Sequence, residues 1–171
     1  MMKKILLLLV LFVGVQETFS QNTIFIGNKS YPCTGAYVLE LESFSTDKSK
    51  IEINFIKDGE RGIIAFTINN YMMPYSRVKN KLVLYLDDNQ VITCIDRGKY
   101  DIVDDYATTL YYLTKEEVNK LKKSNISTIR YTFGDNYDIS LNRTVSNLDI
   151  QGLYGVIKRI DFPSELKDFY K

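Results

Sequence analysis

The sequence has no histidine, no tryptophan, two cysteines and three prolines among its 171 residues. Without histidine the chain cannot build a Ser-His-Asp triad, a Cys-His dyad or a zinc site of the usual histidine type. Two cysteines are too few to hold a structural zinc ion alone. No phosphate-binding loop, dinucleotide fingerprint or CxxC pair is present. Catalysis would therefore have to rest on carboxylates, a single thiol or a Ser-Lys pair.

The chain also lacks a charge excess, since 22 basic residues face 21 acidic ones and give a formal net charge of +1. Bulk charge therefore suggests neither a nucleic acid nor an acidic membrane surface as a partner. Apolar residues make up 45% and charged residues 25%, which is typical of a soluble globular protein. This composition excludes a disordered chain, a collagen-like chain and a multi-span membrane protein.

The first 20 residues have the three regions of a secretory signal peptide. Met1–Lys4 is a short basic start, Ile5–Val15 is apolar, and a polar tail ends at Ser20. The apolar run is too short for the roughly 30 Å of hydrocarbon in a bilayer, which takes about 20 residues. We expect cleavage between Ser20 and Gln21, which leaves one β-rich domain (21–171) in the periplasm or outside the cell, with no membrane span. An uncleaved N-terminal anchor is the alternative.

Apolar and polar residues alternate with a period of two along most of the mature chain. Such runs lie at 51–55, 64–68, 82–86 and 129–133. Alternation of this kind predicts strands with one face in the core. Lys57–Gly62 and Asp87–Gln90 read as hairpin loops between strand patterns. We therefore predict an α+β fold that is predominantly antiparallel β, arranged as a sandwich or as a sheet with a helix.

One short helix is predicted near residues 114–124. Thr114 can cap it, and Glu117 three residues later completes a capping box. Asn125 can end it. A further turn or two of helix is expected to start near Pro163.

The middle of the chain resembles a large class of exported, uncharacterised β-rich proteins of Gram-negative anaerobic gut bacteria. The resemblance covers about 50 residues, and the segments 84–89, 91–98, 112–117 and 126–131 carry it. The turn that usually reads Asp-Gly in that pattern reads Asp88-Asn89 here. The resemblance implies export and a β-rich architecture, and it brings no known activity, catalytic signature or ligand.

The two cysteines, Cys33 and Cys94, leave two alternatives open. An exported chain meets an oxidising environment, so a disulfide between them is permitted. On the chain-entropy model it would close a loop of about 60 residues and add roughly 4 kcal/mol. Two buried free thiols, which behave as small hydrophobic groups, are the other alternative.

A first candidate binding surface lies in the segment Asn69–Asn80, which we expect to be irregular. Its aromatic and sulfur side chains are Tyr71, Met72 and Tyr75. Exposed on a loop, they would form a contact surface for a protein or for sugar rings. Folded back, they would extend the core.

A second candidate surface is acidic. Its residues are Asp96, Arg97, Asp101, Asp104 and Asp105. Carboxylates are the preferred ligands of calcium, although their spacing here matches no EF-hand. The alternatives are a polar surface for a partner and a solvated loop whose acids pair locally. We name no metal site and no cofactor from the sequence, with calcium as the one cofactor weighed.

These observations favour an exported, non-enzymatic binding module whose partner is an unidentified envelope protein or glycan. A small carboxylate-dependent hydrolase is one alternative, and it requires an acid with a raised pKa in a cleft. An enzyme inhibitor is another, and it would present the rigid loop Tyr71–Arg77 to an enzyme cleft. Whether the chain is an enzyme stays open at this point.

Overall fold

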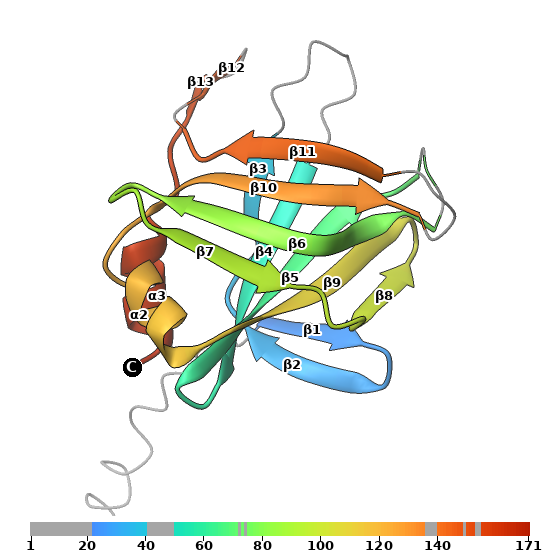
Figure 1. The fold of residues 1–171 in the computed structure, drawn as a ribbon, viewed down its shortest axis with the longest axis horizontal. Coiled ribbons are helices and arrows are strands. Elements are labelled where there is room, and N and C mark those ends of the chain that lie inside the picture. Colours follow the sequence, from blue (N-terminus) through green and yellow to red (C-terminus); the bar gives the residue numbers. More distant parts are fainter. Residues whose placement is uncertain are drawn as a thin grey trace, which may run out of the picture.

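The computed structural model describes residues 22–40, 50–71, 73, 75–135, 140–148, 150–152 and 155–171. The expected signal peptide and Met72 lie outside these residues. The described part consists mainly of antiparallel strands in two sheets, with two helices packed side by side at one end (Figure 1). The predicted α+β, predominantly antiparallel fold is confirmed.

The larger sheet, sheet A, has the strand order β1-β2-β4-β5-β9-β8, with β3 also paired to β4. The smaller sheet, sheet B, has the order β11-β10-β6-β7. The strands of sheet A are β1 (Asn22–Ile26), β2 (Lys29–Cys33), β3 (Tyr37–Glu40), β4 (Lys50–Asp58), β5 (Arg61–Asn69), β8 (Tyr100–Val103) and β9 (Tyr106–Leu113). Those of sheet B are β6 (Arg77–Leu86), β7 (Val91–Ile95), β10 (Ile126–Gly134) and β11 (Ser140–Ser146). A separate small hairpin joins β12 (Ile150–Gly152) and β13 (Gly155–Ile157).

The main core lies between the two sheets and is built by the alternation that the sequence shows. Alternate residues of β4 and of β6 are buried there over most of each strand, for example Phe55 at 0% and Leu82 at 0% exposure. Hairpin register keeps these residues on one face, as in the pair Leu84 and Ile92 of β6 and β7. Apolar burial between the sheets is therefore the main stabilising contribution.

Sheet A also buries its second face, which simple alternation did not predict. Seven consecutive residues of β5, Gly62–Ile68, are buried. Ile63 and Ala65 point away from the main core into a second cluster with Cys33, Ile56 and Leu110. Partly buried residues of the β1–β2 hairpin, including Ile24 and Tyr31, pack against this cluster. The N-terminal hairpin thus covers the outer face of sheet A.

The first helix, α2 (Lys115–Leu121), carries the predicted capping box. The Thr114 hydroxyl accepts a hydrogen bond from the Glu117 N–H at 3.2 Å, and the Glu117 carboxylate accepts one from the Thr114 N–H at 2.7 Å. The helix is shorter than 114–124, because a C-cap forms at Lys122. Among the described residues, no helix has the length and apolar character needed to cross a membrane.

The second helix, α3 (Phe162–Phe169), starts where Pro163 predicts and docks against both sheet A and α2. Phe162 is fully buried and packs edge-on against Phe55 and Tyr37. At its end, the Tyr170 hydroxyl donates to the carbonyls of Ile56 and Arg61 at 3.4 and 3.3 Å. This contact requires glycine at position 62, since a Cβ there would overlap the Tyr170 hydroxyl.

The disulfide considered from the sequence is not formed, because Cys33 and Cys94 lie on opposite sides of sheet A. Cys94 of β7 is buried in the main core between the sheets. Cys33 of β2 is buried in the second cluster, under the N-terminal hairpin. Both are free, and burial raises the pKa of each thiol, that of Cys94 to about 12.

Candidate functional site

The β5–β6 loop projects two tyrosines from one end of the molecule. Tyr71 is 67% exposed and Tyr75 is 75% exposed. The irregular segment is shorter than the predicted Asn69–Asn80, because β6 already begins at Arg77. Tyr75 has a φ of 67°, which is unusual for a bulky side chain and holds the ring away from the core.

Two buried polar residues, Asn70 and Ser76, brace this loop. Their exposed fractions are 3% and 1%. The Asn70 amide donates to the Ser76 carbonyl at 3.1 Å, and the Ser76 N–H donates to the Met73 carbonyl at 3.1 Å. The loop is therefore pinned at both ends, and its tyrosines are presented on a fixed frame.

The β8–β9 turn lies directly beside this loop. Its two turn residues, Asp104 and Asp105, both have positive φ, at 46° and 64°. The Asp105 carbonyl accepts a hydrogen bond of 2.7 Å from the Asn70 N–H. Two segments that the sequence offered as separate surfaces, the tyrosine loop and the Asp104–Asp105 turn, are thus brought together.

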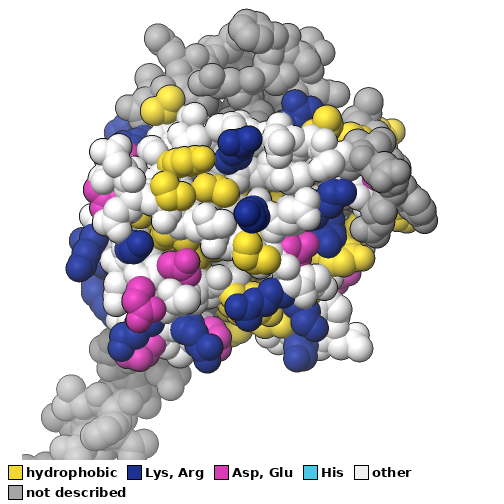
Figure 2. Space-filling model, viewed as in Figure 1, with side chains coloured by type: hydrophobic (Ala, Val, Ile, Leu, Met, Phe, Trp, Pro, Cys, Tyr) yellow, Lys and Arg dark blue, Asp and Glu magenta, His cyan; other side chains and the backbone are white. Residues whose placement is uncertain are grey.

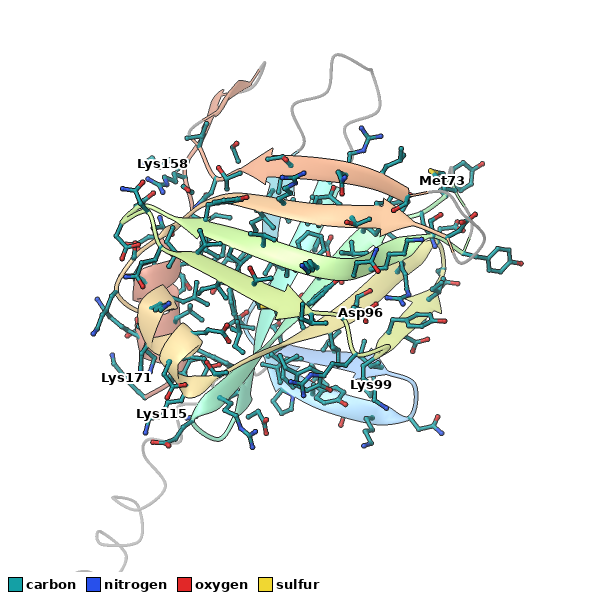
Figure 3. The ribbon with its side chains drawn as sticks, viewed as in Figure 1. Met73, Asp96, Lys99, Lys115, Lys158 and Lys171 are labelled. Carbon is teal, nitrogen blue, oxygen red and sulfur yellow. The ribbon has the colours of Figure 1, made fainter. Side chains whose placement is uncertain are left out.

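Two further apolar side chains, Val103 and Tyr106, flank the turn and complete the surface. They face each other across the β8–β9 ladder and are 58% and 49% exposed. Tyr106 is also paired with Asn69, two residues before Tyr71. We call the exposed side chains of Tyr71, Tyr75, Val103 and Tyr106 the aromatic end. Figure 3 shows sticks projecting from this side, near the labelled Met73.

Val103 and Tyr106 were missed by sequence reasoning, although a signal for them exists. Asp104-Asp105 separates two short β-prone runs, which is a hairpin pattern. The residues on either side of such a turn face each other. Joining that turn to the β5–β6 loop, however, requires the pairing of β5 with β9, which no local pattern reveals.

The structure gives the other predicted surface residues, Asp96, Arg97 and Asp101, internal partners. Asp96 forms an ion pair with Arg77 at 2.6 Å. The Arg97 guanidinium lies 4.9 Å from the centre of the Tyr112 ring. Asp101 accepts a hydrogen bond of 2.7 Å from the Gly27 N–H and so ties β8 to the tip of the N-terminal hairpin. These contacts support the fold and leave the aromatic end as the remaining candidate surface.

The Arg77–Asp96 pair occupies a nearly buried position where the chain passes from sheet B to sheet A. The two side chains are 12% and 10% exposed. Tyr100 of β8 stacks on Arg77, with the guanidinium carbon 4.2 Å from the ring centre. Gly98 donates its N–H to the other Asp96 oxygen at 2.7 Å. Together these contacts fasten the crossover between the sheets.

The nearby Tyr111 hydroxyl is fully buried and has no hydrogen-bond partner among the described residues. Burial raises the pKa of this phenol well above its ordinary value, the charge of Asp96 raises it further, and the charge of Arg77 opposes both. The phenol is therefore neutral at every physiological pH.

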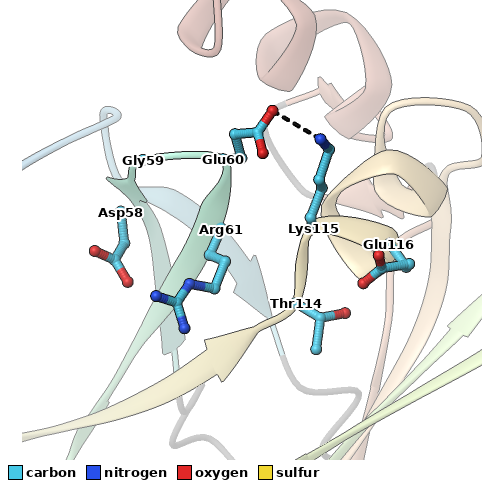
Figure 4. A pocket seen from close by; sticks show the side chains of 7 residues that line it. All are labelled: Asp58, Gly59, Glu60, Arg61, Thr114, Lys115 and Glu116. Atoms are coloured by element: carbon cyan, nitrogen blue, oxygen red, sulfur yellow. Dashed lines mark hydrogen bonds and ion pairs between the residues drawn. The ribbon is translucent and has the colours of Figure 1, made fainter.

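A shallow hollow of about 620 Å³ lies at the opposite end, between the β4–β5 turn and the start of α2 (Figure 4). It is lined by Asp58, Gly59, Glu60, Arg61, Thr114, Lys115 and Glu116. The Glu60–Lys115 ion pair of 2.7 Å crosses it, with side chains 74% and 51% exposed. Exposed pairs of this kind contribute at most about 1 kcal/mol. The hollow is lined by side chains of both charges.

The acidic segment was also weighed as a calcium site. Within the described ranges, no three cysteine, aspartate or glutamate side chains gather closely enough to hold a metal ion. Asp101 is turned toward Gly27, away from a shared site with Asp104 and Asp105.

The face of sheet B seen in Figure 2 carries scattered apolar side chains with lysine and arginine between them. Its exposed apolar residues include Tyr85, Val91 and Ile95. Tyr85 and Val91 are direct cross-strand partners.

Comparison with known protein families, curated proteins and solved structures finds no match to this chain.

Proposed function

We propose that this protein is an exported, non-enzymatic binding module that contacts its partner, an envelope protein or glycan, through the aromatic end. The observation that carries the proposal is the braced loop with two tyrosines more than 60% exposed, next to a turn with a third exposed tyrosine. Tyrosine is enriched at binding surfaces, because its ring gives a large contact area and its hydroxyl bonds at the rim.

The construction of the loop supports a binding role over a merely tolerated exposure. A positive φ at a tyrosine costs on the order of 1 kcal/mol or more and persists only when its surroundings impose it. Here Asn70 and Ser76, which are almost fully buried and hydrogen-bonded to each other, hold the loop in the conformation that gives Tyr75 its positive φ. A rigid, pre-formed surface lowers the entropy that binding must overcome.

The test is a pull-down from a native envelope extract with tagged protein purified from cells that express the full chain. The variant Tyr71→Ser, Tyr75→Asn and Tyr106→Thr removes the three rings. Each replacement suits its backbone, since asparagine tolerates positive φ and threonine suits a strand. The matched control, Phe25→Thr with Tyr85→Thr, removes two exposed rings elsewhere.

We expect a partner that the wild type and the control retain and the three-ring variant loses by tenfold or more. Thermal unfolding and circular dichroism establish that all three proteins are folded. A folded three-ring variant that retains every partner would show that the aromatic end is not the contact surface.

Export is tested on the same purified protein by its intact mass. Cleavage after Ser20 gives a chain that begins at Gln21 and is found outside the cytoplasm. A chain that keeps residues 1–20 and stays in the cytoplasmic fraction would contradict the export part of the proposal.

A further inference from the structure

We infer that the partner bound at the aromatic end presents lysine or arginine side chains, so that a cationic protein segment occupies this surface. The inference rests on the proposed binding function, and it adds the chemistry of the partner. Two observations support it. The turn between the exposed rings is negatively charged, and elsewhere in the molecule a cation is already held by a tyrosine and an aspartate.

The charge at this end is negative and exposed. Asp104 and Asp105 are both exposed, and within the described part of the chain neither forms an ion pair. The two bases nearest the start of neighbouring β6, Arg77 and Lys79, are already engaged, whereas Lys81 lies further along the strand, opposite Ile95 of β7. Arg77 is paired with Asp96, and the Lys79 ammonium donates to the Asp135 carbonyl. Two carboxylates therefore stand beside Tyr106 and the tyrosine loop with their charge uncompensated by these bases.

The molecule contains an internal example of the contacts that such a surface would make, at a nearly buried ion pair with a partly exposed tyrosine. The Arg77 guanidinium lies on the face of Tyr100 while its Nη1 contacts Asp96 at 2.6 Å. A cation is held there by a tyrosine ring and an aspartate at once. At the aromatic end the same two residue types lie side by side in sequence and in space, as Asp105-Tyr106 and Tyr71, and face outward.

The arrangement favours a cationic protein segment over a glycan. Sugar hydroxyl groups both donate and accept, so a glycan site benefits from charged donors as well as acceptors. The charged donors Arg77 and Lys79 already have partners, and the exposed charged groups beside the rings, Asp104 and Asp105, are acceptors only. Carboxylates and ring faces are both attractive to ammonium and guanidinium groups.

The test uses defined probes, which are fluorescein-labelled octaarginine, octalysine and octaglutamate, read by fluorescence anisotropy. The protein is again purified from cells that express the full chain. The variant Asp104→Asn with Asp105→Asn removes both charges and keeps side chains that tolerate positive φ. The control, Asp58→Asn with Glu116→Gln, removes two charges from the hollow at the opposite end.

The wild type and the control are expected to bind octaarginine and octalysine, with octaglutamate at least tenfold weaker. The Asp104/Asp105 variant and the three-ring variant should each bind the cationic peptides at least fivefold more weakly. Raising the salt from 20 to about 200 mM should weaken wild-type binding much more than binding by the Asp104/Asp105 variant.

Equal losses in the control and the Asp104/Asp105 variant would mean nonspecific attraction and would overturn the inference, as would equal affinity for octaglutamate. A partner in the envelope extract that is lost with the three-ring variant but kept by the Asp104/Asp105 variant would also overturn it, while leaving the binding function intact. Release of such a partner by glycosidase treatment of the extract would assign the surface to a glycan instead.

Discussion

Two asparagines, the half-buried Asn125 and the buried Asn147, hold the chain in place just before α3. The Asn147 amide donates to the carbonyls of Ile126 and Ile160 at 2.8 and 2.9 Å, and its oxygen accepts from the Ile160 N–H at 2.9 Å. Asn125 donates to the same Ile160 carbonyl and accepts from the Phe162 N–H. A pattern of residues identifies Asn125 only as a helix end, whereas the structure shows it joining distant segments.

Replacing Asn147 by leucine should destabilise the protein by about 2–4 kcal/mol, because the Ile160 N–H then loses its acceptor and the carbonyls of Ile126 and Ile160 each lose one donor. The free energy of unfolding in urea measures the change. Asn119→Ala, on the exposed face of α2, is the control and should leave stability unchanged or slightly raised. A cost under about 1 kcal/mol for Asn147→Leu would contradict the role we assign to this side chain.

The Arg77–Asp96 ion pair predicts that substitutions at these two residues have strongly coupled effects on the free energy of unfolding. Arg77→Met leaves the Asp96 carboxylate nearly buried without its cation and should cost about 3 kcal/mol. Adding Asp96→Asn to that variant should recover 1 kcal/mol or more, since the unpaired charge is then gone. A double-mutant cycle from urea unfolding gives the coupling energy. Additive losses would mean that the two side chains act independently.

At the scale of elements, local patterns predict which segments are strands and where α2 begins. Ile51, Ile53 and Phe55 alternate with polar residues and do face the main core. The capping box at Thr114 and Glu117 is present as the sequence predicts. Such signals depend on a few neighbouring residues, so they can be read from the sequence without knowledge of the fold.

Removing the α2 cap should show that this box stabilises the helix. Thr114→Ala removes the acceptor for the Glu117 N–H and should cost about 1 kcal/mol. Thr114→Ser keeps the hydroxyl and should restore most of that stability. Chemical denaturation of the three proteins decides this, and an alanine variant as stable as wild type would show that the packing of Val118 and Leu121 alone fixes the helix.

Local sequence patterns do not predict which strands and helices pack against one another. β5 alternates like a strand with one wet face, yet it is buried on both faces because the β1–β2 hairpin folds over Ile63 and Ala65. The candidate surface at the aromatic end depends likewise on the pairing of β5 with β9, two strands far apart in the chain. The acidic residues near one another in the sequence do not form one surface either. Asp96 and Asp101 make internal contacts, and of the four aspartates only Asp104 and Asp105 remain at the surface.

At the scale of the whole molecule, the reactivity of the two buried thiols shows whether the protein is folded. Burial, reinforced for Cys94 by the charge of Glu117, raises their pKa values, so neither is a thiolate at neutral pH. Native protein should react with a thiol reagent such as DTNB at least a hundredfold more slowly than protein in 8 M urea, where both cysteines react. Dithiothreitol should not change the melting temperature. A drop of several degrees on reduction would indicate a disulfide.

The same burial predicts that stability falls at alkaline pH. The folded state raises the pKa of Cys94 from 9.0, and that of Tyr170 from 10.0, to about 12 each, and it raises the pKa values of Tyr37, Tyr111 and Tyr131 as well. The folded chain therefore binds more protons than the unfolded chain above about pH 9. The free energy of unfolding should be nearly constant up to that pH and decline steadily above it.

Tyrosine absorbance at 295 nm checks this directly. The tyrosines whose pKa values burial raises, Tyr111, Tyr131 and Tyr170 among them, should ionise only as the protein unfolds. Tyr170→Phe keeps the ring and removes one of the ionisable groups, so its stability should decline less steeply above pH 10. A single smooth titration of all 13 tyrosines with the fold intact would contradict the assignment.

The contact between Tyr170 and the β4–β5 hairpin has a consequence for how the chain is made. The Tyr170 hydroxyl meets the carbonyl of Ile56, a residue 114 positions earlier, and Phe162 fills the core beside Phe55. A ribosome must therefore synthesise nearly the whole chain before its earliest long hairpin can close around a complete interior. Until then the emerging hairpin lacks the C-terminal helix that completes its interior, so folding of this part is completed only late in synthesis.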